Sequence, residues 1–202
     1  METSKVAAVI LAAGTSSRFR AAAGENGPAT KLTSDLNGKP LVRRVAEAAL
    51  RSHARPVIVV TGYADAAVRD ALEGLPLNFV YNDAFETGMA SSIKRGMAKV
   101  PAEATGALIL LGDMPLVSSD VLDHLIATFE ADMNVKAVVP VYAGQRGNPA
   151  LIARALFPAV EKLSGDVGAR ALLTAAGSDV HEAEVTTSAV IFDVDMPSVL
   201  DP

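Results

Sequence analysis

The feature of this sequence that most constrains its fold is a regular alternation of short β-branched runs with longer stretches rich in Ala, Leu and charged residues. Val6–Leu11 and Ala107–Leu111 are continuous apolar runs, typical of strands that are buried on both faces of a sheet. Strands that alternate with helices of about 10 to 15 residues predict βαβ units and a mostly parallel sheet. We therefore expect a three-layer α/β fold.

Further elements follow the same rhythm along the chain. Strands are also predicted at Val57–Thr61, Leu77–Tyr81, Ala137–Val141, Val180–Val185 and Ala189–Val194. Helices are predicted at Pro40–Ser52, Asp65–Glu73, Ser91–Val100, Ser119–Glu130, Ala153–Lys162 and Val167–Ala176. No internal repeat or low-complexity linker interrupts the series, so we expect one domain over residues 1–202.

Composition argues against several classes of protein. The chain contains no Cys, which removes disulfides, thiolate nucleophiles and zinc sites that use sulfur. Its three histidines share no ligand spacing, and its net charge of −5 includes no basic stripe that would favour nucleic acid as a partner. The first apolar run is too short to span a bilayer, and the features of a signal peptide are missing. We expect a cytoplasmic protein with no membrane partner.

A loop of small residues follows the first predicted strand directly, with the sequence LAAGTSSR from Leu11 to Arg18. Ligands of open parallel sheets bind beyond the carboxyl ends of the strands, which is where this loop would lie. Its small residues let backbone N–H groups approach a phosphate, and Gly14 can adopt a positive φ. Arg18 and Lys31 could supply the positive charge that a triphosphate requires. Without a ligand, the same segment would be a surface turn with two solvated cations.

Acidic residues end two of the predicted strands. Asp113 follows the strand at 107–111, and its carboxylate could hold Mg²⁺, which typically takes one or two protein carboxylates. The alternative is that Asp113 caps the next helix, although Ser118 lies closer to that helix. Asp193 and Asp195 alternate along the last predicted strand and would share one face. The alternative for this pair is a cap for a short final helix that begins at Pro197.

Together these motifs resemble the NTP-transferase superfamily, and within it the molybdenum cofactor cytidylyltransferase-like proteins. The matching segments are LAAGTSSR, GMASS after an Asn, GDMPLV, GQRGNP, GDVGAR and DVDMP, in that order over nearly the whole chain. The loop is neither a Walker loop nor the dinucleotide fingerprint, because the required later glycines are missing. The resemblance implies a Rossmann-like, glycosyltransferase-A-like nucleotidyltransferase fold.

The resemblance also implies roles for individual residues. Arg18, Lys31 and Asp113 would be catalytic, and Asp113 and Asp195 would hold Mg²⁺. Lys39 is the alternative signature lysine, because the segment between Arg18 and Lys31 is longer here than in the family. The residues implied in binding are Leu11, Ala12, Ala13, Gly14, Arg18, Lys31, Gly62, Asn82, Ser91 and Ser92. Simple helix capping would explain either serine equally well, while the family role places the helix N–H groups against an anion.

The activity that the resemblance implies is transfer of CMP from CTP to a phosphorylated acceptor, with release of pyrophosphate. Relatives that use CTP tend to open with LAAG and guanylyl enzymes with LAGG, so Ala13 favours CTP, molybdopterin as acceptor and a molybdoenzyme as client. A methyl near the base would also crowd a purine, although it is worth only about 1–3 kcal/mol. One alternative is a cytidylyl- or uridylyltransferase acting on a sugar or alditol phosphate. Another is a non-catalytic carrier of a cofactor, against which the set of Arg18, Lys31 and Asp113 argues.

Overall fold

The computed structural model describes residues 5–24, 27–132 and 134–195. Its strands are β1 (Val6–Ala12), β2 (Val57–Thr61), β3 (Asn78–Tyr81), β4 (Gly106–Leu111), β5 (Ala137–Tyr142), β6 (Gln145–Arg146), β7 (Ala150–Ala153) and β8 (Val180–Glu184). They form an eight-stranded sheet in the order β3-β2-β1-β4-β7-β5-β6, with β8 beside β5. The strands β1 to β4 pair in parallel, which confirms the expected mostly parallel sheet.

Strand β7 reverses direction within the sheet. It pairs antiparallel with β4 on one side and with β5 on the other, so β5 and β8 run in the same direction as β4. The carboxyl ends of β1, β2, β4, β5 and β8 therefore meet at one edge of the sheet. The chain that follows β8 is delivered to that same edge.

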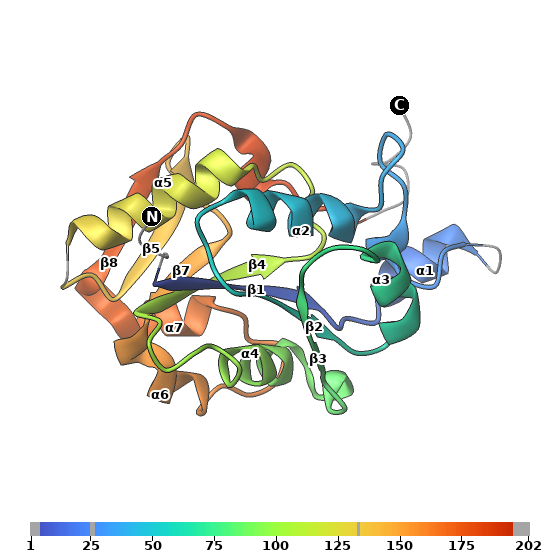
Figure 1. Ribbon diagram of the computed structural model, residues 1–202, viewed down its shortest axis with the longest axis horizontal. Coiled ribbons are helices and arrows are strands. Elements are labelled where there is room, and N and C mark those ends of the chain that lie inside the picture. Colours follow the sequence, from blue (N-terminus) through green and yellow to red (C-terminus); the bar gives the residue numbers. More distant parts are fainter. Residues whose placement is uncertain (1–4, 25–26, 133, 196–202) are drawn as a thin grey trace.

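Helices cover both faces of the sheet. The helices are α1 (Ser17–Ala23), α2 (Leu41–Arg51), α3 (Asp65–Ala71), α4 (Met89–Met97), α5 (Ser119–Ala131), α6 (Phe157–Val160) and α7 (Arg170–Ala176). Short 3-10 helices lie at Lys31–Thr33, Phe85–Thr87, Arg154–Leu156, Gly177–Asp179 and Ser188–Ile191. Helices α2 and α5 cover one face, and α4, α6 and α7 cover the other (Figure 1). The expected three-layer α/β architecture is confirmed.

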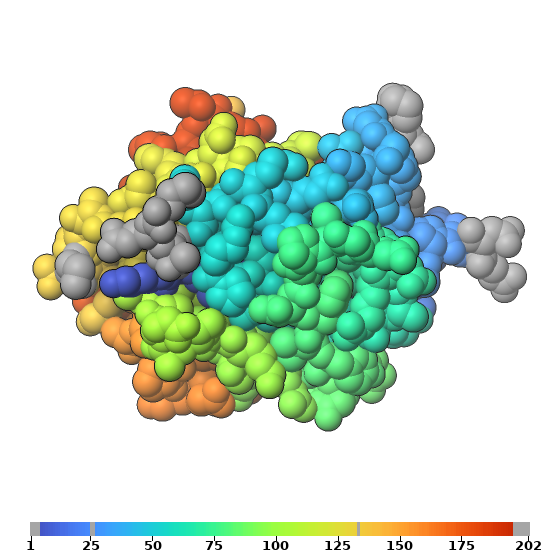
Figure 2. Space-filling view, in the orientation of Figure 1, coloured from blue at the N-terminus to red at the C-terminus, as the bar shows by residue number. Residues whose placement is uncertain are grey.

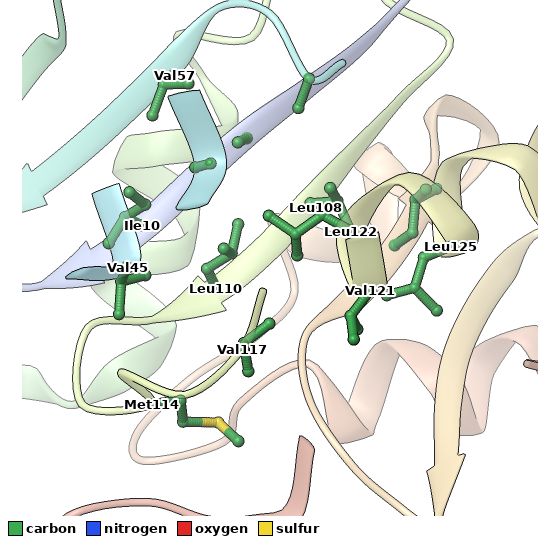
Figure 3. Close-up of a cluster of buried hydrophobic side chains, with 14 of the residues drawn as sticks. Ile10, Val45, Val57, Leu108, Leu110, Met114, Val117, Val121, Leu122 and Leu125 are labelled. Atoms are coloured by element: carbon green, nitrogen blue, oxygen red, sulfur yellow. The ribbon is translucent and has the colours of Figure 1, made fainter. Parts of the chain in front are cut away.

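Strand β1 supplies side chains to the cores on both sides of the sheet. Ala8 and Ile10 pack toward α2 and α5, whereas Ala7 and Val9 pack toward α4. Figure 3 shows Ile10 and the β4 leucines gathered with side chains of α2 and α5. A strand buried on both faces must be apolar at every position, which explains the continuous hydrophobic run in the sequence.

Helix α4 approaches the sheet closely at Gly96. A Cβ atom at that position would lie 2.3 Å from Val9 Cγ1 and 2.9 Å from Val60 Cγ2. Both valines are fully buried, so they have little room to move. The missing side chain thus lets the backbone of α4 rest on β1 and β2, and it fixes where the first turn of α4 lies at the edge of the sheet.

Two predicted elements are wrong. The helix expected at Ala153–Lys162 is replaced by the end of β7, a 3-10 turn and the short α6. The strand expected at Ala189–Val194 is a 3-10 helix over Ser188–Ile191 followed by an irregular segment. Periodicity alone cannot separate a short buried strand from other buried apolar runs, which explains both errors. None of the helices in the described ranges is long and apolar enough to cross a bilayer.

Candidate functional site

A pocket of about 580 Å³ opens at the carboxyl ends of β1 and β4. Residues 11, 13–19, 31–32, 85–86, 88–89, 111–113, 166, 193 and 195 line it. These residues come from six separate stretches of the chain, which the parallel strands bring to one edge of the sheet. Helix α1, one of these stretches, extends from the right-hand side of the molecule (Figure 2).

An ion cluster occupies the floor of this pocket. Lys31 Nζ lies 2.6 Å from Asp113 Oδ2 and 3.4 Å from Asp195 Oδ1. The side chains of Lys31 and Asp113 are 16% and 17% exposed, whereas that of Asp195 is 60% exposed. The structure therefore brings together three of the residues that the sequence singled out, although they are up to 164 positions apart in the chain.

Backbone contacts hold the loops that carry this cluster. Gly112 N donates to Leu11 O at 3.1 Å, and a Cβ atom on Gly112 would lie 2.9 Å from that oxygen. The turn after β4 thus lies directly beside the end of β1. Val194 N donates to Asp113 O at 3.1 Å, which ties the segment that carries Asp195 to the same turn.

The charges of the cluster are unevenly balanced. Burial opposes the charged form of Lys31, but the carboxylates of Asp113 and Asp195 outweigh it and raise the pKa of Lys31 above its ordinary value. Burial, followed by repulsion from Asp195 and Asp113, raises the pKa of Asp193. Three of the five carboxylates that line the pocket thus interact with one another and with a single lysine, which makes this floor attractive to a cation.

The donor chemistry fits a hard divalent cation. Carboxylate oxygens are preferred ligands of Mg²⁺, which usually keeps several waters and takes only one or two protein carboxylates. Within the described ranges, no group of three or more His, Cys, Asp or Glu residues is arranged to hold a metal on its own. The pair Asp113 and Asp195 is sufficient for the kind of site that the sequence predicts.

The local structure around Asp113 does not require it as a helix cap. Ser118 is the N-cap of α5, and its Oγ accepts from Val121 N at 3.4 Å, so Asp113 is not needed as a cap. Asp193 and Asp195 do not alternate along a strand, yet both line the pocket. The final helix expected from Pro197 lies outside the described residues.

The loop after β1 contains one strained residue, and it is not the expected one. Ser16 adopts the left-handed conformation with φ 50°, whereas Gly14 has no positive φ. The Oγ atoms of Ser16 and Thr30 lie 2.9 Å apart. Thr30 directly precedes Lys31, so this contact connects the loop to the segment that carries the lysine.

Two cations that the sequence proposed for the site differ in their surroundings. Arg18, in the first turn of α1, is exposed, lines the pocket and makes no hydrogen bond or ion pair with the described part of the chain. Lys39 pairs with Glu47 of α2 at 2.6 Å and is not among the residues that line the pocket. The geometry thus favours Lys31 over Lys39 as the lysine of the site and leaves Arg18 free to meet a ligand.

Other predicted binding residues do not reach the pocket among the residues described. Asn82 is fully buried and donates to Ser91 Oγ at 2.8 Å and to Ser92 Oγ at 3.0 Å. This network joins the end of β3 to the first turn of α4, so each of its members already has a partner. Ala12 is buried, and Gly62 packs against Ala13.

The first turn of α4 does not offer free donors to an anion, contrary to expectation. Met89 N donates to Asp166 Oδ1 at 3.3 Å, Ala90 N to Gly165 O at 3.0 Å and Ser91 N to Gly88 O at 3.2 Å. Asp166, from the GDVGAR segment, thus reaches across to α4. The first N–H groups of a helix have no partner within the helix, and here other groups of the protein accept their hydrogen bonds.

Gly88 and Gly165 pack backbone to backbone at this side of the pocket. Gly88 has a φ of 106°, and a Cβ atom on it would lie 2.3 Å from the carbonyl carbon of Gly165. The pocket wall here carries Phe85, Glu86, Met89 and Asp166, of which only Met89 was part of a predicted segment for ligand contact. Their position directly after β3 and α6 is the signal that could have identified them.

The methyl group of Ala13 packs against Gly62, although Ala13 also lines the pocket. Ala13 is only 3% exposed, and its Cβ lies 2.8 Å from the place where a Cβ on Gly62 would be. Phe85 Cβ is equally close to that place. The methyl group therefore has little exposed surface with which to contact a base.

Comparisons with known proteins agree with this geometry. The family model of the MobA-like NTP transferase domain matches residues 8–182, in agreement with the resemblance seen in the motifs. The bifunctional protein GlmU of Francisella tularensis is 32% identical over 124 residues, which are 61% of this chain and 25% of that protein. The chain thus spans about a quarter of the length of the curated relatives that it matches.

Solved structures share the fold over nearly the whole chain. A nucleotidyl transferase from Methanothermobacter thermautotrophicus superposes with a TM-score of 0.81 at 25% identity and covers 96% of this chain and 93% of its own. Rv0371c from Mycobacterium tuberculosis has a TM-score of 0.80 at 27% identity, with 96% and 94% covered. The same protein in complex with manganese has a TM-score of 0.71 at 26% identity, with 90% and 89% covered. The expected nucleotidyltransferase fold is confirmed.

Proposed function

Since this chain belongs to the MobA-like NTP transferase family, we propose that it transfers CMP from CTP to a phosphorylated acceptor, molybdopterin or a molybdenum cofactor, and releases pyrophosphate. Nucleotide transfer follows from the family, while the base, the acceptor and the metal are the proposal. The observation that carries the proposal is the position of Lys31 between Asp113 and Asp195, in a pocket that the free Arg18 also lines.

The site offers positive charge for phosphates and negative charge for a cation. Arg18, Lys31 and the amides of the loop after β1 would hold the β- and γ-phosphates and stabilise the leaving pyrophosphate. Asp113 and Asp195 would hold Mg²⁺, which neutralises charge on phosphate oxygens when bound. The manganese complex of Rv0371c supports a divalent ion in a protein of this fold.

The residues of the pocket would act by positioning and electrostatics. An acceptor phosphate has a second pKa near about 6 and is largely ionised at neutral pH, so no general base is required. Its oxygen would attack the α-phosphorus in line with the departing pyrophosphate. This proposal is consistent with a pocket lined by carboxylates and cations but by no histidine within the described ranges.

The choice of base and acceptor rests on the LAAG sequence, because Ala13 is only 3% exposed and packs against Gly62. One observation favours the alternative acceptor, a sugar or alditol phosphate. Glu86 and Asp166 also line the pocket, and their carboxylates would accept hydrogen bonds from hydroxyl groups. A cytoplasmic location, one domain over residues 1–202 and a molybdoenzyme client remain predictions.

A thermal-shift panel tests the nucleotide. With CTP and Mg²⁺ at about 100 times the Kd, the native state gains about 2.7 kcal/mol, and we expect the Tm to rise by about 5–10 °C. GTP, ATP and UTP, and CTP without Mg²⁺, should shift it far less. A shift with GTP alone would assign the guanylyl branch, and no shift with any nucleotide would contradict nucleotide transfer. Pyrophosphate release with molybdopterin or with a sugar phosphate then identifies the acceptor.

Arg18→Ala should raise the KM for the NTP by about 10- to 100-fold, because one charge-assisted contact with the triphosphate is lost. Its Tm should not change, since Arg18 has no partner in the described part of the chain. Steady-state kinetics checks the first expectation. Arg51→Ala is the control, because Arg51 is also exposed and lies at the end of α2, away from the pocket. An unchanged KM in Arg18→Ala would exclude the contact.

A further inference from the structure

Arg20 lies one half-turn of α1 away from Arg18 and is fully engaged with the protein. Its Nε donates to Thr15 O at 2.8 Å, and its Nη1 donates to the hydroxyl of Tyr63 at 2.5 Å. Its guanidinium also lies 4.4 Å from the centre of the Tyr63 ring. Neither Arg20 nor Tyr63 lines the pocket. Because residues two apart on a helix point to different sides, Arg18 can serve the ligand while Arg20 holds the outside of the loop.

Tyr63 is held in turn by the residue that follows β1 and by the wall of the pocket. Its backbone N–H donates to Ala13 O at 3.2 Å. Its ring meets that of Phe85 edge to face, with the centroids 6.2 Å apart and the planes at 73°. Phe85 lines the pocket. Tyr63 and Arg20 thus bind the carbonyls of Ala13 and Thr15, on either side of Gly14.

The loop needs such support because Ser16 adopts the left-handed conformation. A non-glycine residue in this region is strained and persists only where its surroundings hold it. The backbone N–H of Arg20 donates to Ser16 O at 2.9 Å, and the side chain of Arg20 holds the preceding carbonyl. Arg20 therefore binds the carbonyl groups of the two peptides that flank the Cα of Ser16.

We propose that Arg20 and Tyr63 are positioning residues for the triphosphate, which act through the loop of residues 13–16. A carbonyl oxygen that faced the pocket would repel phosphate oxygens, and Arg20 keeps that of Thr15 bound to itself. The inference rests on the proposed function, because it assumes that this loop binds an NTP. It predicts that loss of Arg20 weakens binding of a nucleoside triphosphate much more than binding of the corresponding monophosphate.

Titration calorimetry with CTP and with CMP, in the presence of Mg²⁺, tests this role. For Arg20→Ala we expect the Kd of CTP to rise about tenfold and that of CMP less than about twofold. Tyr63→Phe removes only the hydroxyl and should raise the Kd of CTP about threefold. Arg20→Lys retains the charge but cannot donate to two acceptors in fixed directions, so it should restore only part of the affinity. The double variant should bind CTP no more weakly than Arg20→Ala, because both substitutions remove the same contact between Arg20 and the Tyr63 hydroxyl.

A second arginine–aromatic pair provides a matched control. Arg69 lies 4.6 Å from the centre of the Phe79 ring and pairs with Asp65 at 2.8 Å, away from the loop. Arg69→Ala should leave the Kd of CTP unchanged, and thermal melting should show that all variants are folded. Wild-type protein that binds none of the NTPs would overturn the proposed function and this inference with it.

Binding of CTP by the wild type and equally by Arg20→Ala would overturn the positioning role alone. Weakening in Arg20→Ala with none in Tyr63→Phe would overturn the role of Tyr63, because Arg20 would then hold Thr15 O without its hydroxyl. Equal loss of CTP and CMP affinity would assign Arg20 to general support of the fold instead.

Discussion

Asp113→Asn should lower kcat by about 10³-fold while leaving the protein folded. The amide keeps the shape of the side chain but removes the charge that pairs with Lys31 at 2.6 Å and that we assign to the metal. Loss of one preorganised electrostatic group at a reacting centre typically costs about 10²–10³-fold, and loss of the metal would add to it. Pyrophosphate release under saturating NTP and Mg²⁺ measures the effect.

The stability of Asp113→Asn should change little. Lys31 keeps Asp195 as a partner, and removal of one of three neighbouring carboxylates relieves their repulsion. We expect the Tm to stay within about 4 °C of the wild type, equivalent to about 1 kcal/mol for a chain of this length. Asp179→Asn is the control, because Asp179 pairs with Lys136 at 2.7 Å outside the pocket. Near-normal turnover in Asp113→Asn would remove Asp113 from the catalytic set.

Gly96→Val should destabilise the fold by about 3 kcal/mol and lower the Tm by about 6–12 °C. A Cβ atom at this position already lies 2.3 Å from Val9 Cγ1, and valine adds two methyl groups to the same space. Helix propensity favours valine over glycine by only a few tenths of a kcal/mol, so the steric term decides the sign. Urea unfolding measured by circular dichroism gives the change directly.

Lys94→Val is the matched control for this substitution. It places the same side chain in the same helix at a position with no comparable approach to the sheet, so only the difference in propensity should remain. Gly96→Val with an unchanged unfolding midpoint would show that α4 can move away from β1 and β2. The position of the first turn of α4 would then be set by its loop contacts alone.

The layers of this fold could be predicted because the strands and helices that form them have strong, separate periodicities. The expected strand at Val57–Thr61 matches β2, and the helix expected at Ser119–Glu130 differs from α5 by one residue. Strand β7 could not be predicted in the same way. It has four residues, and its direction depends on pairing with β4 and β5 rather than on its own sequence.

The charged half of the site could also be anticipated, because Asp113 and the loop after β1 follow buried parallel strands. The role of the uncharged polar residues, Asn82, Ser91 and Ser92, could not be anticipated. A buried Asn reads the same in a sequence whether it binds a ligand or, as Asn82 does, two neighbouring serines. Arg20 escaped notice because nothing in its neighbourhood along the chain reveals Tyr63, its partner 43 positions away.

The contact between Gly88 and Gly165 bears on how this wall of the pocket could change over evolution. Gly88 cannot gain a side chain unless the loop that carries Gly165 withdraws, and both glycines have a positive φ, so the path of the backbone is tightly constrained there. Variation is open only to the side chains that the two loops display, Glu86, Met89 and Asp166. Related proteins could therefore diversify by exchanging a few side chains while the backbone keeps the same path. Libraries of variants restricted to these three positions would sample that diversity.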